Sequence, residues 1–150
     1  MNPENGKTKN RFYPKEIPIF YNEPSTEMFE IVITPIFNKG VISKKGFTQG
    51  DCLFKFAGKV QDYQTLYTLQ LKENIYIEDP YFMGMLLHSC EPNAIVNMDA
   101  QEVYALQEIN VGDYITIDYL KTEDMLFQSF QCACGLPNCK GYLVGRNIKK

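Results

Sequence analysis

Short apolar segments recur along most of the chain, separated by residues that favour turns. The first of these segments, 29–37, is β-branched and aromatic, and the others lie at 51–60, 65–71, 75–77, 94–98, 102–109 and 113–120. Lys72, Glu73 and Asn74 separate two of these segments in the manner of a hairpin turn. Short strands with turns at intervals of about 8–12 residues are typical of β-rich domains, and we therefore predict a mostly β fold.

Helix is predicted in only two places. We predict a short helix within residues 79–89 (DPYFMGMLLHS) and a turn or two of helix within residues 122–130 (TEDMLFQSF). Residues 1–15 predict a loose arm. Pro14, Pro18 and Pro24 then indicate an irregular lead-in before the first strand.

The size and composition are those of one ordinary globular domain. The chain has 150 residues, of which 45% are hydrophobic and 22% are charged. Its first 15 residues lack the apolar core of a signal peptide, and no apolar run approaches the roughly 18 residues that span a membrane. We therefore expect an intracellular protein, cytoplasmic or nuclear, with no membrane partner; export without a leader, as an effector, stays open.

The net charge of −3 is unevenly distributed. Residues 61–130 hold 12 Asp and Glu against 2 Lys, which gives −10, whereas residues 1–60 sum to +3 and residues 131–150 to +4. Binding of nucleic acid needs a basic face, so we expect no direct nucleic-acid partner. The acidic middle suits a basic peptide, although a solvated acidic surface explains the same pattern.

The cysteines are clustered near the C-terminus. Three of the five fall within eight residues: Cys132, Cys134 and Cys139. In a reducing compartment such clusters are more often metal ligands or redox groups than disulfides. Thiolates select zinc or an iron–sulfur cluster, and a tetrahedral zinc site needs a fourth ligand. Spacing alone leaves Cys52, Cys90 and His88 as candidates, and leaves a redox dithiol as the alternative to a metal.

Three motifs together resemble the SET-domain lysine methyltransferases. HSCEPN (88–93) resembles the family's NHSCxPN, and GDYITIDY (112–119) resembles its GEELTxDY. CACGLPNC (132–139) resembles the CxCxxxxC of the family's post-SET tail. The segment 38–60 looks like the family's GxGVxAxxxIxxGxxxxxYxGE, so that the resemblance covers residues 28–143.

The resemblance implies a SET-domain fold, with several small sheets around a threaded C-terminal segment and a zinc-bound post-SET tail. We expect an N-terminal arm and lead-in at 1–27, the SET domain at 28–122 and the tail at 123–150. In the family, the cysteine of NHSC joins the three tail cysteines on one zinc. Here that implies Cys90 as the fourth ligand and leaves Cys52 as a buried strand residue. Zinc would tie the tail over the active site.

The implied activity is methyl transfer from S-adenosylmethionine to a lysine of a protein, in a flexible basic segment such as a histone tail. Tyr119 matches the tyrosine of the family's DY pair and is the candidate catalytic residue. Phe56 and Tyr67 match the substrate channel, and Ile117 matches a position that tunes the number of methyl groups added. The implied cofactor contacts are Lys39, Gly40, Tyr67, Leu87, His88, Tyr119 and Leu143.

The chain departs from the family pattern at several cofactor positions. Leu87 replaces the asparagine of NHSC, Gly84 stands where arginine is usual, and Asn38 replaces the first glycine of the cofactor loop. Phe56 stands where the family usually has tyrosine. Two alternatives to an enzyme therefore remain. One is a catalytically degenerate SET-like module that binds a peptide, and the other is a small zinc-stabilised interaction domain.

Overall fold

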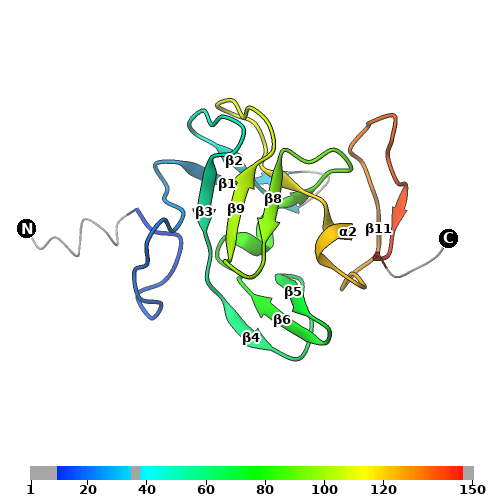
Figure 1. The fold of residues 1–150 in the computed structure, drawn as a ribbon, viewed down its shortest axis with the longest axis horizontal. Coiled ribbons are helices and arrows are strands. Elements are labelled where there is room, and N and C mark those ends of the chain that lie inside the picture. The colour runs from blue at the N-terminus through cyan, green and yellow to red at the C-terminus, as the bar shows by residue number, and fades with distance from the viewer. Residues whose placement is uncertain (1–9, 35–37, 147–150) are drawn as a thin grey trace, which may run out of the picture.

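The computed structural model describes residues 10–34 and 38–146, which fold into small β-sheets with very little helix (Figure 1). Each sheet has two or three strands. The pairs are β1 (Phe29–Thr34) with β2 (Asn38–Ser43), β7 (Leu87–His88) with β10 (Thr116–Ile117), and β11 (Phe130–Gln131) with β12 (Tyr142–Leu143). The three-stranded sheets, in spatial order, are β3 (Cys52–Lys55), β9 (Glu102–Ala105), β8 (Ala94–Asn97), and β4 (Lys59–Gln61), β6 (Ile75–Glu78), β5 (Thr68–Lys72). The predicted mostly β fold is confirmed.

The segment that carries β10 is threaded between two other parts of the chain. On one side, the Ile115 N–H donates to the Val41 carbonyl of β2 at 2.9 Å. On the other side, β10 runs parallel to β7. The side chain of Asn93 holds the same segment, because its Nδ2 donates to the Tyr114 carbonyl at 2.8 Å and its Oδ1 accepts from the Thr116 N–H at 2.9 Å. An amide side chain both donates and accepts, so Asn93 fixes the segment by two backbone bonds.

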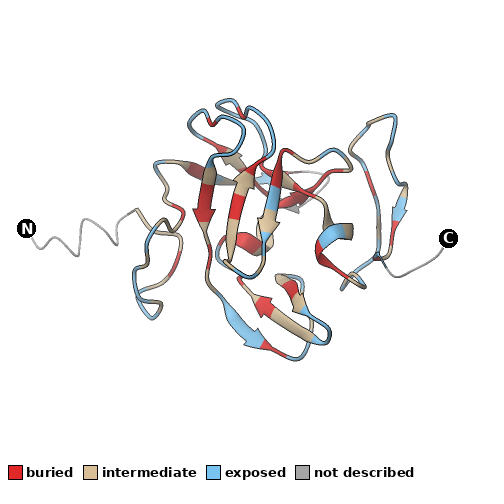
Figure 2. Ribbon diagram, in the orientation of Figure 1, coloured by how far each residue is buried: buried red, intermediate tan, exposed pale blue. Residues whose placement is uncertain are grey.

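The core lies between the small sheets and is rich in phenylalanine (Figure 2). Phe29, Phe54 and Phe82 contact one another edge to face, with ring centroids 4.9–5.5 Å apart. None of the three side chains is more than 1% exposed. Edge-to-face aromatic pairs add stability beyond the area they bury, so this cluster holds β1, β3 and the segment before β7 together.

The lead-in packs on the domain through Tyr13. This side chain is 3% exposed, and its hydroxyl donates to Asp79 Oδ2 at 2.6 Å. Asp79 is fully buried and also accepts the backbone N–H groups of Tyr81, Phe82 and Met83, each at 3.0 Å. The predicted loose arm is therefore wrong for residues 10–15; its first nine residues lie outside the described part of the chain.

Both helical predictions are resolved by the structure. The first is confirmed as a short 3₁₀ helix, η1 (Met83–Met85). The second is wrong, because the helix is α2 (Tyr119–Thr122), which begins earlier and meets the predicted range only at its last residue. Asp118 caps α2 by accepting the Leu120 N–H at 3.0 Å. Among the described helices, none is long and apolar enough to cross a membrane.

We predict that Tyr13→Phe destabilises the fold by about 1–3 kcal/mol, because it removes one donor from a buried carboxylate. The free energy of unfolding, measured by chemical denaturation, checks this value. Tyr21→Phe is the matched control, since Tyr21 is 90% exposed. An equal change in the two variants would contradict a role for the Tyr13–Asp79 bond.

Candidate functional site

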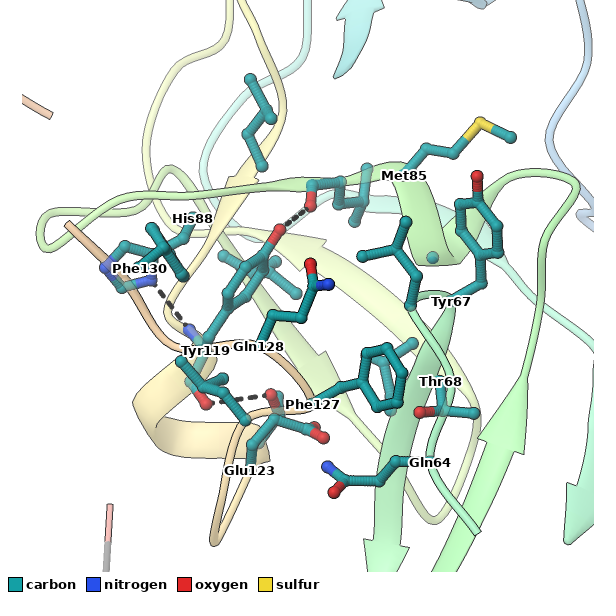
Figure 3. Close-up of a pocket in the computed structure, with 18 of the residues that line it drawn as sticks. Gln64, Tyr67, Thr68, Met85, His88, Tyr119, Glu123, Phe127, Gln128 and Phe130 are labelled. Atoms are coloured by element: carbon teal, nitrogen blue, oxygen red, sulfur yellow. Dashed lines mark hydrogen bonds between the residues drawn. The ribbon is translucent and has the colours of Figure 1, made fainter. Parts of the chain in front are cut away.

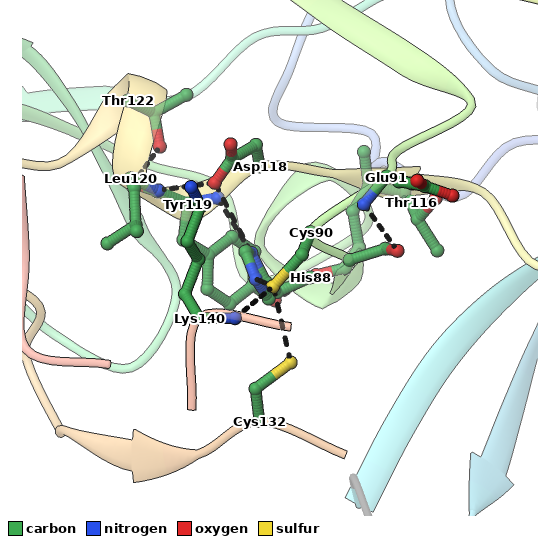
Figure 4. Close-up of polar contacts among 12 residues, drawn as sticks. His88, Cys90, Glu91, Thr116, Asp118, Tyr119, Leu120, Thr122, Cys132 and Lys140 are labelled. Carbon is green, nitrogen blue, oxygen red and sulfur yellow. Dashed lines mark hydrogen bonds and ion pairs between the residues drawn. The ribbon is translucent and has the colours of Figure 1, made fainter. Parts of the chain in front are cut away.

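Four cysteines form one cluster that joins the tail to the body of the domain. Cys90 lies after β7, whereas the other three belong to the tail, and all four sulfurs lie within 4.8 Å of one another. The cluster comprises Cys90, Cys132, Cys134 and Cys139. Zinc–sulfur bonds of about 2.3 Å in a tetrahedron place the sulfurs about 3.8 Å apart. The Cys90 and Cys132 sulfurs are 3.8 Å apart, so the donor set fits zinc (Figure 4).

The tail turns back on itself to gather its cysteines. Cys132 donates its N–H to the Gly141 carbonyl at 2.9 Å beside the β11–β12 pair, and Cys139 donates to the Leu136 carbonyl at 3.1 Å. The Lys140 N–H donates to the Cys90 sulfur at 3.2 Å. These backbone bonds hold the tail loop against the ligand from the body of the domain.

The fifth cysteine, Cys52, is not part of this cluster. It lies at the start of β3, as expected of a strand residue. The expectation that it is buried is wrong, because the residue is only half-buried. Its sulfur accepts a hydrogen bond from Asn22 Nδ2 at 3.3 Å. Cys52 is therefore a built-in control for experiments on the cluster.

The pKa values of the thiols in the cluster are shifted in opposite directions. Burial raises the pKa of Cys132 to about 12, and burial also raises the pKa of Cys90. In contrast, a hydrogen bond from the Leu136 backbone lowers the pKa of Cys134 to about 6. Four thiolates this close repel one another, and only a bound cation allows all of them to ionise together. The chemistry of the donor set therefore favours a metal over four free thiols.

We predict one zinc per chain, lost when any one of the four clustered cysteines is replaced by serine. Loss of the metal should lower the melting temperature, because the tail has little core of its own. Elemental analysis of protein purified without chelators tests the stoichiometry. Cys52→Ser should retain the metal. Wild-type protein without zinc, or zinc loss in Cys52→Ser, would contradict the assignment.

A cavity of about 420 Å³ lies beside the cluster (Figure 3). One wall comes from residues 64–69 and another from residues 83–88, which include η1 and β7. Tyr119 and Glu123 contribute from α2 and the position after it. Residues 126–130 of the tail close the remaining side. The tail therefore forms one side of this cavity.

Tyr119 is fixed on the cavity wall through both its side-chain hydroxyl and its backbone N–H. Its hydroxyl donates to the Leu86 carbonyl, and its N–H donates to His88 Nδ1 at 3.0 Å (Figure 3). Burial raises the pKa of the Tyr119 phenol, and the charge of Glu123 raises it further. The phenol therefore keeps its proton at neutral pH, and its oxygen retains lone pairs that can accept a hydrogen bond from a ligand.

His88 connects the cysteine cluster to Tyr119 (Figure 4). Because Nδ1 accepts the Tyr119 N–H, we assign the proton of the neutral ring to Nε2, which lies 3.5 Å from the Cys90 sulfur. Burial lowers the pKa of His88, and the nearby Asp118 opposes this shift. A neutral imidazole with a contact at each of its two nitrogens acts as a structural link.

The structure brings most of the implied site residues to one cavity. They come from β2, from the turn before β5, from β7, and from the segment that carries β10 and α2. The predicted residues on the cavity wall are Lys39, Tyr67, Leu87, His88, Ile117 and Tyr119. They are distant in the sequence, so their convergence is a result of the fold and supports the site as a whole.

Three of the implied residues do not line this cavity. Phe56 is 1% exposed and belongs to the core cluster, so we assign it to packing. Leu143 is also 1% exposed and lies on β12, within the tail itself. Gly40 lies against Leu87: a Cβ on Gly40 would come within 2.9 Å of Leu87 Cδ1. A larger residue there would force the Leu87 side chain to shift.

The absence of arginine at Gly84 has a steric cause. A Cβ at this position would lie 2.5 Å from the Asp79 carbonyl oxygen and 2.7 Å from the Tyr67 carbonyl oxygen. Both contacts are to backbone, which cannot move away as a flexible side chain can. The turn that contains η1 therefore packs directly on Tyr67. Asn38 also departs from the family pattern, but its side chain lies outside the described part of the structure.

A second connection, independent of the cysteines, ties the tail to the body. Arg146 donates to Asp124 Oδ1 at 2.6 Å and to the Lys121 carbonyl at 2.7 Å. Asp124 Oδ2 in turn accepts from Gln70 Nε2 at 2.7 Å, and Gln70 Oε1 accepts the Asp124 N–H at 2.6 Å. This chain of contacts links the end of the tail, the segment after α2 and strand β5.

We predict that Arg146→Ala leaves the zinc content unchanged but speeds amide hydrogen exchange in residues 125–131. The ion pair is partly exposed, so the cost in global stability should be small, about 0.2–1 kcal/mol. Lys59→Ala, on the distant strand β4, is the control variant. Unchanged exchange in Arg146→Ala would show that the cysteine cluster alone positions the tail.

Some residues of the cavity were not expected from the sequence. Phe127 and Phe130 close it from the tail, and Phe130 contacts the rings of His88 and Tyr119 at centroid distances of 6.1 Å and 6.0 Å. Glu123 adds a buried carboxylate. The apolar pair at 126–127 (LF) before the cysteines was the available signal, but we interpreted it as helix.

Comparison with known proteins gives relatives of one kind. No family model matches the chain. The variant-silencing SET domain-containing protein of Plasmodium falciparum is 25% identical, over 81% of this chain and 6% of the relative. Histone-lysine N-methyltransferase ASHH2 of Arabidopsis thaliana is 27% identical, over 65% of this chain and 7% of the relative. The chain thus spans less than a tenth of the length of either relative.

Solved structures give the same fold. KRYPTONITE, in complex with mCHH DNA, an H3(1-15) peptide and SAH, has a TM-score of 0.62 and 21% sequence identity, over 76% of this chain and 29% of that chain. Its likeness is one of fold. Taken with the threaded β10 segment, the cysteine-tied tail and the sequence relatives, it identifies this chain as a SET-domain fold related to the SET-domain histone-lysine methyltransferases.

Proposed function

We propose that the chain transfers a methyl group from S-adenosylmethionine to a lysine side chain of a protein. The observation that carries the proposal is the position of Tyr119, anchored to Leu86 and His88 on the wall of a cavity closed by the tail. Relatives of the chain include a histone-lysine methyltransferase, and KRYPTONITE has been solved with SAH, the product form of the methyl donor. The bound donor would supply an electrophilic sulfonium methyl.

The residues of the chain would then orient the incoming amine and exclude water from it. Tyr67 and Ile117 contribute aromatic and apolar surface to the cavity. A lysine has an ordinary pKa of about 10.4, and transfer into an apolar channel lowers it, which favours the neutral nucleophile. The Tyr119 oxygen, whose proton is engaged by Leu86, would accept a hydrogen bond from that amine and aim its lone pair at the methyl.

The proposed substrate is a lysine in a flexible basic segment such as a histone tail. The negative charge of residues 61–130 supports this choice, because it attracts basic peptides. KRYPTONITE has been solved with an H3(1-15) peptide, which supports a histone segment as the ligand to test first. That neighbour also contacts DNA, whereas the acidic middle of this chain leads us to propose no direct contact with nucleic acid.

Tyr119→Phe should lower the rate of methyl transfer by about a hundredfold, or roughly 2.7 kcal/mol of barrier, because it removes the oxygen that orients the amine. Transfer of a labelled methyl group to a histone H3 peptide measures the effect. Zinc content and cofactor affinity should change little, since ring packing is preserved.

Ser129→Ala is a control, because it also removes one hydroxyl, and that hydroxyl is paired with the Tyr142 hydroxyl at 2.8 Å. Equal rates for wild type and Tyr119→Phe would remove Tyr119 from the mechanism. The replacements at Gly84 and Leu87 favour a second candidate, a peptide-binding module without activity. Wild-type protein that binds peptide and cofactor but transfers no methyl to a broad set of lysine peptides would select that candidate.

A further inference from the structure

Glu123 places a buried carboxylate on the wall of the cavity. The residue follows α2, one helical turn after Tyr119, and is 6% exposed. Figure 3 shows it among the side chains that line the cavity, together with Tyr119. Among the described lining residues, it is the only acid, and Lys39 is the only lysine or arginine. An otherwise largely apolar cavity therefore carries one negative position.

The carboxylate of Glu123 has hydrogen bonds but no cationic partner among the described residues. Oε2 accepts the Gln70 N–H at 2.8 Å. No side-chain nitrogen of lysine, arginine or histidine in the described chain lies within 4.0 Å of it. The nearby guanidinium of Arg146 forms an ion pair with Asp124 instead, with Nε 2.6 Å from Oδ1.

Burial therefore raises the pKa of Glu123, although hydrogen bonds from Gln70 and Thr122 and the charge of Arg146 oppose the shift. A buried carboxylate without a cation is costly, and the cost is removed when a cation enters. The cavity wall is the side from which such a cation can reach Glu123.

We propose that Glu123 binds an alkylammonium group of the ligand that fills this cavity. The inference rests on the proposed function, which offers two sources of this chemistry. One is the α-ammonium of the methyl donor, and the other is the side-chain ammonium of the substrate lysine. In either case Glu123 binds the charged form of its ligand, whereas Tyr119 accepts a hydrogen bond from the neutral amine at the point of transfer.

Glu123→Gln tests the proposal, because glutamine keeps the size of the side chain and an oxygen that can accept the Gln70 N–H. Calorimetry on the full chain would measure binding of S-adenosylhomocysteine and of its analogue without the α-amino group. If the cofactor is the source, the variant should bind S-adenosylhomocysteine about tenfold to a hundredfold more weakly, with the analogue unchanged.

If the peptide is the source, cofactor binding should stay unchanged. The variant should then lose the preference for a histone H3 peptide with lysine over the same peptide with norleucine, which lacks the ammonium. Glu102→Gln is the matched control, because Glu102 lies on β9 and outside the cavity. It should preserve both preferences.

The proposal is overturned if Glu123→Gln retains both ammonium preferences, or if it weakens all ligands equally while lowering the melting temperature. The proposed function fails in a different way, namely when wild-type protein binds neither S-adenosylhomocysteine nor the peptide. Binding by wild type with unchanged preferences in Glu123→Gln would therefore remove the role of Glu123 alone.

Discussion

The site depends on four thiol sulfurs that lie within 4.8 Å of one another, one from the body of the domain and three from the tail. Strands β11 and β12 have two residues each, too few to be stable by themselves in water. A metal held by Cys90 and the tail cysteines supplies the missing free energy. Without that connection the contacts of Arg146 and Asp124 alone would have to hold the tail, and the cavity would open more easily.

The segment 88–93 (HSCEPN) connects the cysteine cluster to the part of the cavity wall formed by Tyr119. Cys90 supplies a sulfur, and His88, two residues earlier, accepts the backbone N–H of Tyr119. Asn93, three residues after Cys90, aligns the threaded segment that leads to Tyr119. A single loop thus positions the tail, the threaded strand and the proposed catalytic phenol, which explains how distant parts of the chain keep a common geometry.

The arrangement could be predicted from the sequence where a local turn or a recognisable motif determines the position of a residue. The tail cysteines were predicted to cluster because a tight turn leaves them few other positions, and Cys90 entered through resemblance. Helix α2 was missed because its residues continue a strand-like pattern, and only the cap at Asp118 signals the change. Phe56 faces the core because the fold decides which side of a strand is buried. Apart from its spacing from Tyr119, nothing in the sequence indicates that Glu123 lines the cavity.

A metal bound by the four cysteines should make the ligand cavity by holding the tail in place. The most direct measurement is the affinity for S-adenosylhomocysteine before zinc removal, after chelation, and after zinc is returned. Chelation should abolish or strongly weaken binding, and added zinc should restore it, with the body of the domain still folded by circular dichroism. Unchanged affinity in folded protein that has lost its zinc would show that the metal does not make the cavity.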